Sequence, residues 1–327
     1  MIFFTFLRKN IISLGLLVLL CACADKSAVT HIHLAHGLNE QHPVHLGIVR
    51  FAELVKERTK GEVEINIFPN GQLGNERECL ELIQIGSLGI TKVASSTLEN
   101  FSQGFKIFTI PYLFRSATHK AHVLQGDIGI GLLNQLNQAK MQGLCYFDAG
   151  SRSFYTKFGA VTSSSNIKGK KIRVMKSQNA IQMIEKFGGI ASPISYGELY
   201  TALQQGVVDG AENNLPSFVT SKHYEVCKYY SFSEHASFPD VLVIGQEVWE
   251  TLTDAQQAIV QQAALEASVY QSELWKKAES ECIEILKKEG VQLNYPDKTS
   301  FMADVQSMKE QLPTELKTLV KKVAEVE

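Results

Sequence analysis

The stretch from Asp254 to Glu289 constrains the fold of this chain more than any other part of its sequence. It contains 36 residues without a proline or a glycine, and Thr253 with Gln256 forms a capping-box pattern at its start. A single helix over this stretch would be roughly 54 Å long at 1.5 Å per residue, which exceeds the width of one small lobe. We therefore expect a long helix, straight or kinked, that lies across two lobes and braces them. Two helices with an unmarked break between them are the alternative.

Strands alternate with amphipathic helices along the rest of the chain. Apolar residues recur at spacings of three and four between Val44 and Val55, which predicts a helix, and the alternation at 63–68 predicts a strand. This order is typical of an α/β protein with a mostly parallel sheet. A comparable set of elements follows between 172 and 206, so we expect two lobes. We assign 31–149 and 239–278 to the first lobe, and 150–238 and 279–327 to the second.

Composition and charge narrow the class of protein. Of the 327 residues, 45% are hydrophobic and 20% are charged, so the chain can bury a full core and is not disordered. The 32 Lys and Arg residues against 34 Asp and Glu residues give a formal net charge of −2. A nucleic-acid-binding protein normally carries an excess of positive charge, so we expect no nucleic acid partner.

The N-terminus has the pattern of a targeting segment. Arg8 and Lys9 precede a mostly apolar run at 11–22, which is too short to span a bilayer stably. The sequence Leu20-Cys21-Ala22-Cys23 is typical of a bacterial lipoprotein processing site, with Cys23 as the lipid-bearing first residue of the mature protein. We therefore predict a signal peptide at 1–22, a tether at 23–30 and a periplasmic body anchored to a membrane by one lipidated terminus. An ordinary secretory cleavage nearby is the alternative.

The remaining cysteines form no recognisable metal or redox motif. Cys79, Cys145, Cys227 and Cys282 are widely and irregularly spaced, and none belongs to a CxxC pair. We favour buried free thiols, with a single disulfide bridge as the alternative.

The motifs expected of an enzyme are missing from the sequence. It contains no GxSxG, no HExxH and no GxxxxGK[ST]. His31, His33 and His36 could ligate a metal, as could the pair His119 and His122, but no carboxylate or cysteine cluster completes either group. We therefore expect neither catalysis nor a metal or cofactor, and a secreted hydrolase is the more distant alternative.

Arginine is scarce in this chain, and only six arginines lie outside the predicted signal peptide. Arg173 lies in an apolar strand pattern between Ile172 and Val174, and Arg152 lies where a strand gives way to polar residues at the proposed lobe boundary. A guanidinium can grip a carboxylate through two parallel hydrogen bonds, so two of them near one crevice would bind an acid. Exposed arginines on edge strands are the alternative.

A polar cluster ends the block from Glu198 to Asn214. A short helix stops at Gly206, two valines follow, and then come Asp209, Glu212, Asn213 and Asn214. Carboxylates and carboxamides just past a strand end suit a polar ligand at the carboxyl edge of a sheet. A turn rich in Asp, Asn and Gly is the alternative.

Four stretches carry a likeness to a known family; they are Gly71 to Glu78, Ile110 to Arg115, Gly169 to Val174 and Glu198 to Asn214. Taken together, they resemble the substrate-binding subunits of tripartite ATP-independent periplasmic (TRAP) transporters. They occur in the family's order, and the likeness extends from about Ile32 to the C-terminal helices. The resemblance implies an α/β, two-lobed periplasmic binding protein with a hinge and a long helix spanning both lobes. It also implies a role in capturing an organic acid and delivering it to a TRAP permease of two membrane subunits, driven by an ion gradient.

The resemblance also implies which residues bind the ligand. The family's central carboxylate-gripping arginine falls on Arg173, and further ligand-facing positions fall on Arg152, Asn213, Glu76, Tyr196 and the segment that begins at His36. Where sialic-acid-binding members have a ligand-facing glutamate, this chain has Ala94, which argues against sialate.

The predicted site residues favour one class of acid. Arg173 and Arg152 would supply the paired positive charge that a buried carboxylate needs. Glu76, Asn213 and Tyr196 offer acceptors and donors for hydroxyl groups, whereas a short dicarboxylate would need another cation at its far end. We expect a sugar acid, a uronate or an aldonate, with a C4-dicarboxylate or a keto acid as the alternative.

Overall fold

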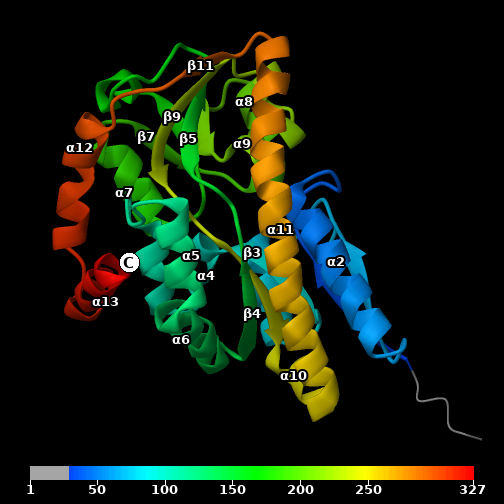
Figure 1. The fold of residues 1–327 in the computed structure, drawn as a ribbon. Coiled ribbons are helices and arrows are strands. Elements are labelled where there is room, and N and C mark those ends of the chain that lie inside the picture. The colour runs from blue at the N-terminus through cyan, green and yellow to red at the C-terminus, as the bar shows by residue number, and fades with distance from the viewer. Residues whose placement is uncertain (1–28) are drawn as a thin grey trace, which may run out of the picture.

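The computed structural model describes residues 29–327, which form two lobes, each built on its own sheet (Figure 1). The predicted signal peptide, Cys23 and most of the predicted tether lie outside these residues. Among the helices of residues 29–327, none combines the length and the hydrophobicity that crossing a membrane requires.

The first lobe contains a five-stranded sheet in the order β2-β1-β3-β10-β4. Strand β1 pairs in parallel with β2 and β3, and β10 lies antiparallel between β3 and β4. Its strands are β1 (Thr30–Ala35), β2 (Val63–Phe68), β3 (Ile90–Ala94), β4 (Met141–Phe147) and β10 (Asp240–Gly245). Its helices are α2 (Pro43–Arg58), α3 (Glu76–Gln84), α4 (Ser95–Leu98), α5 (Ala117–Gln125), α6 (Asp127–Gln135) and α10 (Gln246–Thr251), with 3-10 turns at Gln103–Thr109 and Leu136–Ala139.

Both faces of this sheet are buried. Alternation along β10 places Leu242 and Ile244 in the core under α2 and the long helix, and places Val241 and Val243 in the core under α3, α5 and α6. A sheet covered on both faces keeps the carboxyl ends of its strands available at one edge, where the cleft between the lobes lies.

The second lobe contains a six-stranded sheet in the order β11-β9-β5-β8-β6-β7. Strand β5 is antiparallel to both of its neighbours, while β6 runs parallel to β7 and β8. Its strands are β5 (Arg152–Thr156), β6 (Lys171–Val174), β7 (Ile190–Pro193), β8 (Gly210–Asn213), β9 (Tyr229–Ala236) and β11 (Gln292–Asn294). Its helices are α7 (Gln178–Lys186), α8 (Leu199–Gln204), α9 (Leu215–Thr220) and α12 (Thr299–Glu310), with 3-10 turns at Ser164–Ile167, Tyr196–Glu198 and His223–Glu225.

One continuous helix, α11 (Asp254–Lys288), spans both lobes (Figure 1). It has 35 residues and begins with the predicted capping box, in which the Thr253 side chain accepts from Gln256 N. Its first half contributes Val260 and Ala263 to the core of the first lobe, and its last turns contribute Cys282 and Leu286 to that of the second. The prediction of a single brace is confirmed, and the alternative of two helices is wrong.

The chain crosses between the sheets at 148–151 and again at 237–239. The two crossings are joined by Lys120, whose Nζ lies 2.6 Å from Asp148 Oδ1 and 3.3 Å from Ser237 Oγ. Gln271, in the middle of α11, holds the first crossing by accepting from Asp148 N and donating to Asp148 O. These contacts lie beside positions 149 and 239, where we proposed the lobe limits.

The C-terminal helix α13 (Thr314–Glu325) packs on the first lobe, although 279–327 was expected in the second. Leu316 and Val323, seven residues apart, insert into the core that contains Phe105 and Phe108. The end of the helix is held by Arg115, whose Nη1 donates to Ala324 O at 2.6 Å. The amphipathic pattern of α13 predicts a buried face, and the three-dimensional arrangement decides which core receives it.

All four cysteines of the described chain are buried and unpaired. Burial raises the pKa of the Cys79 thiol to about 11 and that of Cys227 to about 12. The prediction of free thiols is confirmed, and the alternative of a disulfide bridge is wrong.

Candidate ligand-binding site

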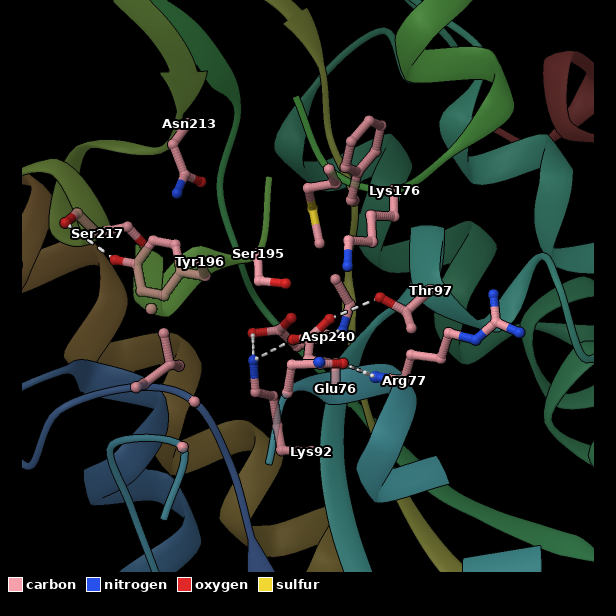
Figure 2. Close-up of a pocket in the computed structure, with 18 of the residues that line it drawn as sticks. Glu76, Arg77, Lys92, Thr97, Lys176, Ser195, Tyr196, Asn213, Ser217 and Asp240 are labelled. Atoms are coloured by element: carbon pink, nitrogen blue, oxygen red, sulfur yellow. Dashed lines mark hydrogen bonds and ion pairs between the residues drawn. The ribbon is translucent and has the colours of Figure 1, made fainter. Parts of the chain in front are cut away.

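A cavity of about 400 Å³ lies between the two lobes. The first lobe lines it with the 70–78 loop, β3 and the start of β10, and the second lobe with the ends of β6 and β8 and the 194–198 segment (Figure 2). Of the predicted site residues, Arg173, Arg152, Asn213, Glu76 and Tyr196 all line this cavity. The fold therefore brings together five of the six positions, which lie far apart in sequence.

Arg173 is a buried cation that keeps most of its donors free. Ile172 and Val174 point into the core of the second lobe, so alternation along β6 turns Arg173 toward the cavity. The side chain is 2% exposed, and its Nε donates to Ile194 O at 2.8 Å. Within the described residues its terminal nitrogens make no hydrogen bond. Burial lowers the pKa of Arg173, as expected for a cation removed from water without a counter-charge.

Arg152, by contrast, is already paired. Its Nε lies 2.5 Å from Glu212 Oε2, its Nη2 lies 2.8 Å from Glu212 Oε1, and its Nη1 donates to Asn213 Oδ1 at 2.8 Å. Arg152 therefore lines the cavity together with Arg173, but its donors already have partners in the second lobe. Glu212 balances the charge of Arg152, and this leaves Arg173 as the uncompensated cation of the pair.

Glu212 is held from its other side by His235. The His235 Nε2 lies 3.5 Å from Glu212 Oε2, and both side chains are fully buried. Burial alone would raise the pKa of Glu212, but Arg152 and His235 together hold it at about 2. Sequence reasoning placed Glu212 in the polar cluster without assigning it a partner, because the pairing of β5 with β8 sets Arg152 beside it.

A second charged cluster lies on the first lobe, around Lys92. Its Nζ lies 3.3 Å from Glu76 Oε1 and 3.3 Å from Asp240 Oδ2, and Lys92 itself is 2% exposed (Figure 2). In the β3–β10 pairing Lys92 is opposite Leu242, so Asp240, two residues before Leu242, faces the same side. Sequence reasoning missed both Lys92 and Asp240. The available signal was a lysine inside the strand 90–94, where its neighbours are Ile90, Thr91, Val93 and Ala94.

Glu76 is fixed within this cluster by the start of α3. The helix begins with a capping box between Asn75 and Glu78, which orients its first turn. The Glu76 carboxylate accepts from Ala94 N at 3.1 Å and from Thr97 Oγ1 at 2.7 Å, as well as pairing with Lys92. Its oxygens face the cavity with a defined orientation.

Tyr196 and Asn213 complete the wall that the second lobe provides. The Tyr196 hydroxyl lies 2.6 Å from Ser221 Oγ and 3.2 Å from Ser217 O, so the residue presents its ring to the cavity (Figure 2). The Asn213 Oδ1 accepts from Arg152 and from Asn214 N, while its Nδ2 makes no hydrogen bond within residues 29–327. The cavity thus receives an aromatic face and an available amide donor.

His36, the sixth predicted site residue, does not line the cavity. It is 1% exposed, its Nδ1 accepts from Leu38 N, and its Nε2 lies 3.0 Å from His45 Nδ1. Burial lowers the pKa of His36 to about 3, so the ring is neutral. It shapes the loop that carries Leu38 and His42 to the cavity.

The histidines that could have ligated a metal have other partners. His31 Nδ1 lies 3.7 Å from Glu64, and His119 Nε2 lies 2.9 Å from Val323 O. In the part of the chain that the structure describes, no group of three or more His, Cys, Asp or Glu side chains is arranged to hold a metal ion.

The structure has two lobes, each built on its own sheet, and a buried cation in the cleft between them whose terminal nitrogens have no partner among residues 29–327. This arrangement is typical of a solute-binding protein. The family model for bacterial extracellular solute-binding protein, family 7, matches residues 34–315, and the chain belongs to this family.

Among its relatives is the uncharacterized protein YiiZ of Salmonella typhimurium, which is 36% identical over 280 residues, 85% of each chain. A TRAP periplasmic solute-binding protein from Xanthobacter autotrophicus, solved with bound β-D-galacturonate, superposes with a TM-score of 0.88 at 33% identity, covering 90% of this chain and 100% of that one. A second, from Polaromonas sp. JS666 bound to D-erythronate, has a TM-score of 0.89 at 29% identity and covers 91% of this chain and 99% of the other.

Proposed function

We propose that this protein captures a sugar acid with one carboxylate, a uronate or an aldonate, and delivers it to a TRAP permease. The observation that carries the proposal is Arg173, a fully buried guanidinium whose terminal nitrogens have no partner among the described residues. Such a cation is costly to bury unless an anion joins it. The solved relatives that bind galacturonate and erythronate support the same class of ligand.

The carboxylate of the acid binds Arg173 at the end of β6. The planar fork of the guanidinium matches a carboxylate in two parallel hydrogen bonds, which a lysine could not provide. Asn213 adds its amide donor. Arg152 adds a polar side chain to the wall of the cavity, but no net charge, because Glu212 balances it. This arrangement gives the acid one strong anchoring point on the second lobe.

The rest of the ligand faces the Lys92 cluster on the first lobe. Lys92 is flanked by the carboxylates of Glu76 and Asp240, so its charge is already matched. A second carboxylate on the ligand would meet two carboxylates there, whereas hydroxyl groups can donate to them. The cluster therefore favours a sugar acid over a C4-dicarboxylate, and the ring of Tyr196 offers a flat apolar surface for a sugar.

Closure of the two lobes around the acid creates the surface that the permease recognises, with no reaction of the ligand. The family assignment supports transport rather than catalysis. A periplasmic location, with the body anchored through a lipid on Cys23, is part of the proposal and rests on the sequence motif at 20–23.

A thermal-shift screen of the purified protein tests this function. The panel contains D-galacturonate, D-glucuronate, D-gluconate, pyruvate, succinate and L-malate. We expect a uronate or aldonate at 100 times its Kd to stabilise the fold by about 2.7 kcal/mol, with no response to the dicarboxylates. A response to succinate or malate with none to the sugar acids would refute the proposal, and product analysis of the incubated acids would reveal a hydrolase.

A further inference from the structure

The two lobes also touch at a place outside the cavity, around Glu99. This residue follows α4 in the first lobe and is 3% exposed, and it is not among the residues that line the cavity. Its Oε1 accepts from Gln178 N of the second lobe at 2.8 Å, and its Oε2 accepts from Thr109 Oγ1 of its own lobe at 3.0 Å. One carboxylate therefore joins the two lobes directly.

The group that Glu99 contacts is the N-terminus of helix α7. Gln178 is the first residue of this nine-residue helix, whose unpaired amide groups favour a negative charge. A neighbouring contact reinforces the junction, since Asn179 Nδ2 donates to Thr109 Oγ1 at 2.8 Å and to Lys106 O at 3.3 Å. We call these interactions the Glu99 contact.

The Glu99 contact is connected to the ligand anchor by a short run of chain. Strand β6 ends one residue after Arg173, and Met175 and Lys176, which follow, both line the cavity. Ser96 of the first lobe adds a link in between, with its Oγ 3.2 Å from Met175 Sδ. The position of Arg173 relative to the first lobe is thus linked to whether Glu99 holds Gln178.

We propose that Glu99 is a positioning residue for ligand binding, whose contact with α7 forms when the lobes close on the acid. The inference rests on the proposed function. Helix α7 lies on the far side of the second lobe from α11, the helix common to both lobes (Figure 1). In a hinge rotation the displacement grows with distance from the axis, so a contact far from the shared helix is expected to be present in the closed arrangement and lost in the open one. The Glu99 contact slows release of the acid without touching it.

The test compares Glu99→Ala with Glu99→Gln and with Glu185→Ala, a matched control at an exposed position of α7. D-galacturonate serves as the probe, and surface-bound full-length protein gives its association and dissociation rate constants. We expect Glu99→Ala to raise the dissociation rate about tenfold and to leave the association rate within twofold. Glu99→Gln, which keeps an acceptor for Gln178 N, restores most of the loss, and the control behaves as wild type.

Thermal unfolding separates a closure contact from a permanent one. We expect Glu99→Ala to leave the midpoint of the ligand-free protein unchanged and to reduce the rise that D-galacturonate produces. An equal fall of the midpoint with and without ligand, or a wild-type dissociation rate in Glu99→Ala, would overturn the inference while the proposed function stands. A wild-type protein that binds no uronate or aldonate would refute the proposed function, and this inference with it.

Discussion

Arg152 and Glu212 share two parallel N–H···O hydrogen bonds, 2.5 Å from Nε to Oε2 and 2.8 Å from Nη2 to Oε1, beside the cavity between the lobes. Both side chains are almost completely buried. The pair therefore contributes a fixed dipole rather than a net charge, and our proposal assigns the anchoring of an acid to the neighbouring Arg173.

Removing one partner of this pair is expected to destabilise the fold. Glu212→Gln leaves Arg152 buried without a counter-charge, which should lower the free energy of unfolding by about 3–5 kcal/mol. Urea unfolding should show this loss, and Glu185→Gln at an exposed position should show none. The double variant Arg152→Met, Glu212→Met should regain most of the stability; a double variant as unstable as Glu212→Gln would contradict the explanation.

Replacing Arg173 is expected to separate stability from binding. Arg173→Met removes a buried cation that has a single hydrogen-bonded partner in the described chain, so the ligand-free protein should be more stable, by about 1 kcal/mol or more. Calorimetry should detect no binding of D-galacturonate. Arg50→Met, at a side chain that is 42% exposed, is the control. If Arg173→Met binds D-galacturonate with an affinity within tenfold of wild type, Arg173 is not the residue that anchors the carboxylate.

Asp240 is expected to determine the preference for one carboxylate. The wild type should bind D-galacturonate at least about 100-fold more tightly than galactarate, which carries a second carboxylate at the other end. Asp240→Asn removes one of the two negative charges beside Lys92 and should narrow this ratio about tenfold. Asp304→Asn, at an exposed position of α12, is the control. An unchanged ratio of the two affinities would show that the Lys92 cluster does not discriminate between acids with one and with two carboxylates.

Buried neutral histidines predict a loss of stability in mild acid. Burial lowers the pKa of His36 and of His223 to about 3, from the ordinary value of 6.5. The unfolded chain takes up these protons below pH 6.5 and the folded chain does not, so stability is present above that pH and falls as the pH drops toward 3. Each group contributes up to about 1.4 kcal/mol per pH unit. Urea unfolding at pH 7, 6 and 5 should show a free energy of unfolding that falls with pH. His223→Gln should reduce this dependence by the share of one titrating group. A free energy of unfolding that does not change over this range would contradict the prediction.

The features predicted correctly depend on local sequence. The length of α11 follows from a capping box and the lack of helix breakers, both readable within a few turns. The orientation of Arg173 away from the core follows from strand alternation, which separates it from Ile172 and Val174. Such patterns require no knowledge of which strands become neighbours.

The features that were missed depend on pairing between distant segments. Lys92 and Asp240 meet only because β10 inserts next to β3, although almost 150 residues separate them. Glu212 cancels the charge of Arg152 for the same kind of reason, through β5 and β8. Helix α13 shows the same limit, since its amphipathic pattern predicts a buried face but not the lobe that covers it. His36 was expected to face the ligand, and its contact with His45 instead depends on the packing of α2 beside β1.

An unbroken α11 also limits how the two lobes can move relative to each other. The small side chains of Ala263, Ala264 and Ala267 hold the first half of the helix against one lobe, and its last turns are held in the other. Any swing of the lobes must bend this rod, because rotation about its long axis would tear one of the two ends from its core. Opening of the cleft would therefore require a bend in α11 between the two ends that are held in the cores.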